Sequence, residues 1–126
     1  MTKKSKKILT EVSAGELLDK ISILEIKLDK ITDKENLQEI NKEYKSLNDA
    51  KKSHLEITPD IQNLIDQLKN VNIKLWSIED EKRICEKNKD FGKNFIELAR
   101  NVYKHNDKRA KIKSDINSLL KSISKK

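Results

Sequence analysis

The chain has 126 residues, of which 39% are charged and only 4% are aromatic, and it contains two Gly and one Pro. This length suits one domain, and this composition favours helices packed through Leu and Ile over a sheet, which needs many turns. The single cysteine, Cys85, excludes an internal disulfide, and no apolar run resembles a membrane span or a signal peptide. We therefore expect an all-α protein of the reducing cytoplasm that does not engage a membrane.

The net charge of +7 is concentrated at the two ends of the chain. Residues 1–7 contain four Lys and residues 121–126 contain three, with no acid in either segment, so residues 8–120 are formally neutral. Only three basic residues are Arg, the side chain best suited to bidentate phosphate contacts. This distribution disfavours a nucleic-acid-binding domain. Weak binding of nucleic acid through the lysine tails is kept as a second alternative.

Local start signals predict the first two helices. Ser13 and Glu16 have the spacing of a capping box, so we expect a helix from Ala14. Its apolar surface is wider than a two-helix stripe, which indicates a central position in the fold. Asp33 is the expected cap of a second helix that ends near Lys52 and carries a narrower apolar stripe. This second helix should lie on the outside.

Two longer helices are predicted in the second half of the chain. Thr58 followed by Pro59 is a strong helix start, because Pro at the first helical position gives up no hydrogen bond. The third helix should cover residues 59–87, and the fourth should be capped by Asp90 and end near residue 122. Because the connection is short, we expect these helices to form a long antiparallel, coiled-coil-like hairpin.

These elements predict a helical bundle of about four helices. We expect a basic flexible arm over residues 1–12, one helical domain over residues 13–123 and a frayed tail over residues 124–126. Broad apolar coverage on the first helix makes self-association plausible.

The last helix has an apolar heptad seam that two polar residues interrupt. The apolar seam residues are Phe95, Leu98, Val102, Ile112, Ile116, Leu119 and Ile123. His105 and Arg109 occupy the two middle positions, so they face a partner helix and not water. An isolated buried ion costs several kcal/mol or more, so Arg109 requires a carboxylate or a bound anion. The alternatives are a structural network that sets the helix register and a ligand site.

The candidate site residues are polar side chains that the predicted bundle places near this break. They are Arg109, His105, Arg100, Glu79, Asp80, Asn106, Asp107, Glu16, Asp19 and Glu25. Among them, Arg100 is placed to reach the acidic residues Glu79 and Asp80 before the turn. No spacing of His and Cys suits zinc, no serine lies on a nucleophile elbow and no glycine loop could hold a phosphate. We therefore predict no metal site and no cofactor, and we assign no catalytic residue.

Four separated segments carry a resemblance that spans nearly the whole chain. They are Glu11–Lys27, with the motif E-V-S-x-G-E-L-L-D-K-I, Leu75–Asp80, Phe91–Arg100 and Tyr103–Lys113. In this order they resemble an uncharacterised family of short all-helical proteins from bacteria and their phages. The resemblance implies no activity. It implies that a set of polar residues recurs, namely Glu16, Asp19, Lys20, Glu25, Lys27, Glu79, Asp80, Arg83, Glu86, Arg100, Asn106, Asp107 and Arg109.

Two shorter resemblances concern enzymes. The segment Leu17–Leu28 is similar to the first helix of all-helical chorismate mutases, which hold a dicarboxylate with several Arg and Lys, but it contains no Arg. The pair Glu16-x-x-Asp19 matches one half of the acidic motifs with which all-α nucleotide pyrophosphatases hold magnesium. The E-x-x-E half of those motifs is absent from the sequence.

Our hypothesis from the sequence is a helical binding or assembly module that acts through contacts with a protein partner or a second copy. Apolar seams are abundant, whereas nucleophiles, metal ligands and phosphate-binding loops are missing. The leading alternative is a small-anion or nucleotide-binding enzyme that uses the polar cluster around Arg109. The two hypotheses differ on whether Arg109 lies in an open cavity or in a closed ion pair.

Overall fold

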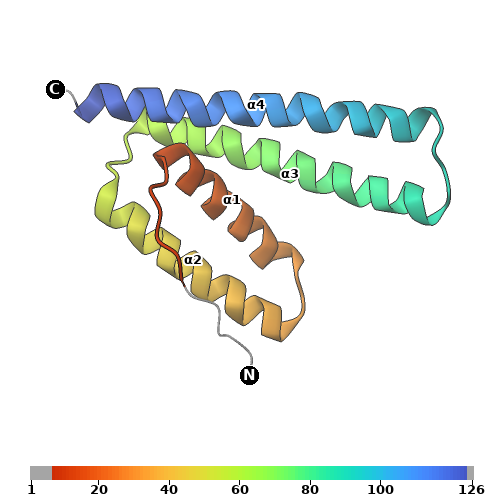
Figure 1. The fold of residues 1–126 in the computed structure, drawn as a ribbon, viewed down its shortest axis with the longest axis horizontal. Helices are drawn as coiled ribbons and strands as arrows, with labels where there is room; N and C mark the ends of the chain where they lie inside the picture. Colours follow the sequence, from red (N-terminus) through yellow and green to blue (C-terminus); the bar gives the residue numbers. More distant parts are fainter. Residues whose placement is uncertain (1–6, 125–126) are drawn as a thin grey trace.

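The computed structural model describes residues 7–124, and within them the chain forms four helices and no strand (Figure 1). The helices are α1 (Ala14–Lys30), α2 (Lys34–His54), α3 (Pro59–Lys87) and α4 (Lys93–Ser124). The all-α prediction is therefore confirmed. Residues 1–6 of the predicted arm and residues 125–126 of the predicted tail lie outside the described residues, and residues 7–12 form no helix. None of the helices in residues 7–124 is long and apolar enough to cross a membrane.

Three of the predicted helix starts are present with their expected caps. The Ser13 hydroxyl accepts a hydrogen bond from the Glu16 backbone N–H, and Asp33 and Thr58 accept the corresponding bonds at the starts of α2 and α3. Only half of the predicted capping box forms, because the Glu16 carboxylate lies 2.7 Å from the Lys113 ammonium on α4. An ion pair between two helices has replaced the local bond back to Ser13.

The predicted cap of α4 is wrong. The Asp90 carboxylate accepts a hydrogen bond from the Gly92 backbone N–H, and α4 begins only at Lys93. Lys89 has a positive φ of 56°, and the backbone N–H of Asp90 donates to the carbonyl of Cys85. The turn therefore needs two more residues than expected, because the carboxylate closes the turn itself and not the helix that follows. The other end of α4 also extends beyond the predicted residue 122.

Helix α1 is the central element of the fold, as its broad apolar surface predicts. It contacts the other three helices, whereas α2 packs against α1 alone and has no buried residue. The main core forms where α1 crosses α3 and α4, and its buried side chains are Leu18, Ile61, Leu68, Val71, Ile112 and Ile116. The solvated, outer position predicted for α2 is therefore observed.

A glycine lets α1 approach α4 closely at one end of this core. A Cβ atom built on Gly15 would lie 2.5 Å from the backbone carbonyl oxygen of Lys113. The backbone N–H of Gly15 donates to the side-chain oxygen of Asn117 at 2.7 Å. Since any other residue would force the two backbones apart, Gly15 determines how deeply the start of α1 sits against α4.

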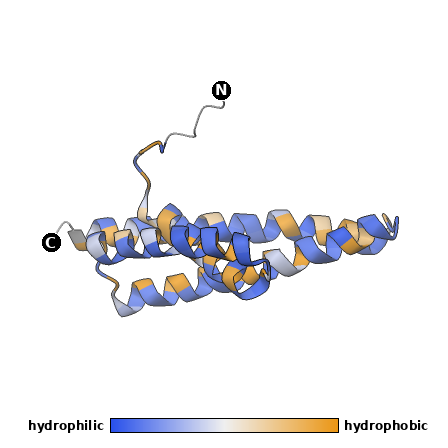
Figure 2. Cartoon of the chain, turned by 90° about the horizontal axis from the view of Figure 1, so that it is seen from below, coloured by the Kyte–Doolittle hydropathy of each residue, from blue (hydrophilic) through white to orange (hydrophobic). Residues whose placement is uncertain are grey.

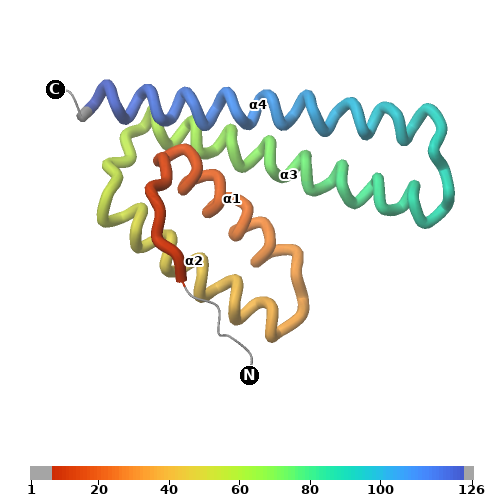
Figure 3. Tube along the Cα trace, viewed as in Figure 1, coloured from red at the N-terminus to blue at the C-terminus, as the bar shows by residue number. Residues whose placement is uncertain are grey.

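Helices α3 and α4 form the predicted antiparallel hairpin, and it extends well past α1 and α2 (Figures 1 and 3). We call residues 78–103, which include the turn, the distal arm. Its buried side chains are Ile78, Cys85 and Leu98, with Phe95 and Val102 packed against them. Apolar residues are interspersed with polar ones along this part of the hairpin (Figure 2). The arm thus has a small core of its own, and α1 lies near it at its base, where Ile23 and Ile26 share a cavity with Glu79, Asp80 and Arg83.

Candidate functional site

Arg109 on α4 forms a bidentate ion pair with Asp19 on α1. Its Nε atom lies 2.9 Å from Asp19 Oδ1, and its Nη2 atom lies 2.5 Å from Oδ2. The Asp19 side chain is 4% exposed and the Arg109 side chain 27% exposed. The seam position of Arg109 predicts a half-buried side chain with an acidic partner, and the structure places one there.

Asp19 is held from a third helix as well. Asn72 on α3 donates from Nδ2 to Asp19 Oδ1 at 3.0 Å and to the hydroxyl of Ser22 at 3.2 Å. Ser22 lies about one turn after Asp19 on α1, and both are buried. The network therefore joins α1, α3 and α4 at the break in the apolar seam.

Both members of the pair are stabilised in their charged forms. Burial acts to raise the pKa of the Asp19 carboxyl, but hydrogen bonds from Arg109 and Asn72 and the charges of Arg109 and Lys113 outweigh it, so the pKa lies below its ordinary value of 3.8. The hydrogen bond to Asp19 raises the pKa of Arg109 above its ordinary value. A carboxylate this well satisfied is not set up to exchange protons near neutral pH.

Two further predicted residues lie beside the pair. The Asn106 side-chain oxygen accepts a hydrogen bond from Arg109 Nη1 at 3.4 Å. The Glu16 carboxylate contributes to the raised pKa of Arg109 and makes its own ion pair with Lys113. The structure thus brings Glu16, Asp19, Asn106 and Arg109 together.

Three predicted residues of α4 do not join this group. The His105 ring bonds through Nδ1 to the Asn101 carbonyl of its own helix at 2.8 Å. Arg100 pairs with Glu97 one turn earlier, at 3.7 Å, and not with the acidic cluster before the turn. Asp107 is exposed. The first two side chains thus interact within their own helix, His105 by a hydrogen bond and Arg100 by an exposed ion pair, and heptad spacing alone does not predict this.

Glu25 belongs to a separate polar contact between α1, α2 and α3. Its carboxylate accepts a hydrogen bond from the Tyr44 hydroxyl at 3.3 Å and lies 3.7 Å from the Lys69 ammonium. Burial and the neighbouring Glu25 charge raise the pKa of Tyr44 above its ordinary value of 10.0. This contact attaches the outer helix α2 to the centre of the fold.

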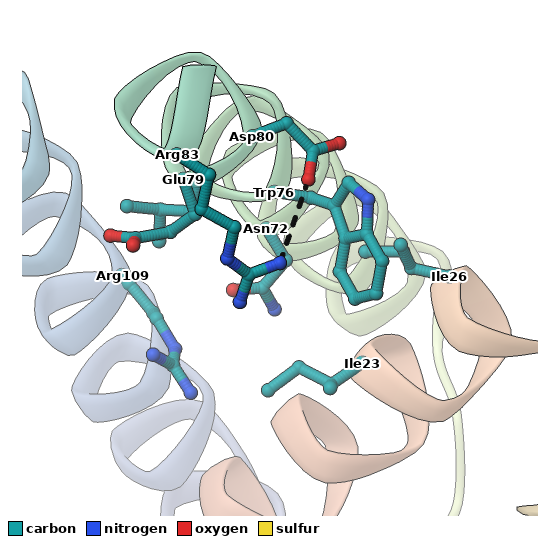
Figure 4. A pocket seen from close by; sticks show the side chains of 9 residues that line it. Ile23, Ile26, Asn72, Trp76, Glu79, Asp80, Arg83 and Arg109 are labelled. Atoms are coloured by element: carbon teal, nitrogen blue, oxygen red, sulfur yellow. Dashed lines mark ion pairs between the residues drawn. The ribbon is translucent and has the colours of Figure 1, made fainter. Parts of the chain in front are cut away.

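Glu79 and Asp80 lie on the wall of a cavity that Arg109 also lines (Figure 4). The cavity has a volume of about 230 Å³, opens to solvent and is lined by residues of α1, α3 and α4. Its lining residues are Ile23, Ile26, Asn72, Leu75, Trp76, Glu79, Asp80, Arg83 and Arg109. Arg109 therefore combines the two situations that the sequence presents as alternatives, since it is in a closed ion pair and at the edge of a cavity.

The candidate site residues predicted from the sequence include neither Asn72 nor Arg83, although the family resemblance places Arg83 among the recurring polar residues. Asn72 is almost fully buried in the structure. The sequence signal that could have identified it is its position directly after the apolar seam residue Val71. Arg83 lies within a run of charges on α3, which usually marks a solvated helix face. Its place beside the cavity depends on where α1 crosses the hairpin.

A second, larger cavity of about 800 Å³ lies beside α1 and α2 and shares Ile23 and Arg109 with the first. Its remaining lining residues are Glu11, Val12, Ser13, Ala14, Glu16, Leu17, Asp19, Lys20, Leu47, Ala50, His54 and Leu55. Across residues 7–124, no three His, Cys, Asp or Glu side chains are grouped so that they could hold a metal ion.

Comparison with known proteins places the chain in a family. Neither a search of the curated proteins nor a search of the solved structures gave a match. A family model, described as a family of unknown function (DUF6165), matches residues 8–125. That match covers almost the whole sequence and all four helices. The chain therefore belongs to this family of unknown function.

Proposed function

We propose that the chain is a protein-binding module that acts through protein–protein contacts, and that the distal arm is its contact surface. The observation that carries this proposal is the exposure of large apolar side chains on the arm. Ile84 is 59% exposed, Phe91 48%, Ile96 54% and Tyr103 53%. Two of these are aromatic, the class of side chain that is enriched in protein interfaces.

Single exposed apolar residues are common on monomers and need no explanation. The relevant observation is that four of them lie on the same hairpin. Here they belong to a two-helix projection whose own buried core consists of Ile78, Cys85 and Leu98. Two helices by themselves can bury little apolar surface, and a partner that covers the arm would enlarge this core. The projection of the arm beyond α1 and α2 makes it accessible from several sides (Figure 3).

The Asp19–Arg109 pair favours this function over an enzyme built around Arg109. The Nε–Nη2 edge of the guanidinium is already occupied by a buried carboxylate, and Nη1 donates to Asn106. An anion at Arg109 would have to compete with Asp19, whose removal from the guanidinium would leave a buried charge unpaired. The pair is therefore better suited to joining helices than to binding a reacting group.

The first test measures the mass of the protein by light scattering across a range of concentrations. We expect the wild-type chain to self-associate and Ile84→Ser with Ile96→Ser to reduce the association at least tenfold. The matched control is Ile8→Ser with Leu9→Ser, which removes two even more exposed apolar side chains before α1. The control should behave as the wild type, because those residues lie outside the distal arm.

A second test detects a different protein as the partner. A photo-crosslinking amino acid at position 103 should give one discrete adduct in cells, whereas the same amino acid at position 9 should give none. A chain that stays monomeric at all concentrations and gives no adduct specific to position 103 would contradict the proposal.

A further inference from the structure

We propose that the cavity between α1, α3 and α4 binds a small amphiphilic carboxylate, with Arg83 as the side chain that holds the anion and Trp76 as the apolar wall. This site does not depend on the distal arm binding a protein. It also differs from the anion site expected at Arg109, because the available guanidinium is that of Arg83.

Arg83 has hydrogen-bond donors to offer. Its nearest acidic partner is Asp80, and the ion pair spans 3.8 Å, which is too long for a hydrogen bond. The two side chains are 79% and 55% exposed, and ion pairs of this kind contribute little stability. A guanidinium carries five N–H donors, so Arg83 can take up a carboxylate and remain close to Asp80.

The direction of the Arg83 side chain places its guanidinium at the cavity. Figure 4 shows its guanidinium directed into the space between α3 and α4, with that of Arg109 on the opposite wall. Arg109 is fixed there by Asp19, whose carboxylate neutralises its charge, so Arg83 is the guanidinium that would attract an anion. The Glu79 carboxylate is paired with Lys82 at 3.6 Å, which offsets its repulsion of an incoming anion.

The rest of the lining selects an apolar body for the ligand. Ile23 and Ile26 come from α1, and Leu75 and Trp76 come from α3. The Trp76 indole offers a flat surface on which a ring or a branched chain can pack. A cavity of about 230 Å³ is smaller than the about 300 to 1,000 Å³ typical of drug-sized ligands, so a molecule of roughly ten non-hydrogen atoms fits better than a nucleotide.

The only tryptophan of the chain lies in this cavity, so its fluorescence reports directly on binding. Phenylacetate is the probe, and we expect a saturable change in Trp76 fluorescence with a dissociation constant in the millimolar range or below. Phenylacetamide has the same shape without the charge, and acetate has the charge without the ring. Each should bind at least tenfold more weakly than phenylacetate, because phenylacetamide lacks the charge for Arg83 and acetate lacks the ring for Trp76.

Arg83→Gln should weaken phenylacetate binding at least tenfold, which corresponds to about 1.4 kcal/mol. The matched control is Arg100→Gln, because Arg100 also pairs with an acid one turn away on its own helix, is also exposed, and lies outside the cavity. The control should change the dissociation constant by less than twofold. Circular dichroism should show unchanged helicity in both variants, since both side chains are on the surface.

Three results would overturn the site. They are the absence of a saturable fluorescence change, equal binding of phenylacetate and phenylacetamide, and equal effects of Arg83→Gln and Arg100→Gln. None of these results would bear on the protein-binding function, because that function is tested with Ile84, Ile96 and Tyr103.

Discussion

Loss of one partner of the Asp19–Arg109 pair should destabilise the protein strongly. In Arg109→Met the long apolar side chain keeps much of the packing, but the Asp19 carboxylate stays buried at 4% exposure without its cation. Leaving a buried charge unpaired in this way lowers the free energy of unfolding by about 3 to 5 kcal/mol. Because Arg109 is itself 27% exposed and water can reach its side of the pair, we expect the lower end, about 3 kcal/mol. This is a large fraction of the about 5 to 15 kcal/mol by which a domain is stable.

The loss should depend on pH in a direction set by Asp19. The folded protein lowers the pKa of this carboxyl below its ordinary value of 3.8, so the pair stabilises the fold above that pH. As the pH falls through the lowered value, Asp19 takes up a proton and the contribution is lost. Without Arg109, burial makes Asp19 easier to protonate. The difference in stability between the wild type and Arg109→Met should therefore be largest near neutral pH and should shrink in acid.

Urea denaturation followed by circular dichroism at neutral and acidic pH measures these differences. The control is the double variant Asp19→Leu with Arg109→Met, which removes both charges and should recover most of the lost stability, because no ion is left buried. A loss below about 1 kcal/mol for Arg109→Met near neutral pH would refute the reasoning, since it would mean that the pair behaves like a surface ion pair. A double variant as unstable as Arg109→Met alone would refute it too.

Other parts of the fold give predictions of their own. Gly15→Ala should lower the melting temperature, with a cost of about 1 to 3 kcal/mol, because the new methyl group would meet the Lys113 carbonyl at 2.5 Å. Leu98→Ala removes one of three buried side chains of the distal arm, so amide hydrogen exchange should speed up in the arm while the main core stays protected. The Tyr44 phenol should ionise above its ordinary pKa of 10.0 in an ultraviolet titration, so its bond to Glu25 stabilises the fold below that pH and is lost as the pH rises through the raised value.

The helices and most of their ends follow from local sequence. Ser13, Asp33 and Thr58 act on backbone N–H groups three residues away, so their effect can be predicted without knowing the rest of the fold. Asp90 shows the limit of this reasoning, because its carboxylate accepts from the Gly92 N–H inside the turn and does not cap the helix that follows. The seam spacing likewise shows that Arg109 needs a partner.

Tertiary structure alone selects that partner. Several carboxylates on three helices were equally good candidates for Arg109, and Asp19 is the one that faces it where α1 crosses the hairpin. The crossing depends on the close approach at Gly15 and on side chains far apart in the sequence, so no local pattern contains it. The same crossing reaches only the base of the distal arm, where it leaves the cavity beside Arg83. For this reason the surfaces that can bind a partner or a ligand were the least predictable part of the protein.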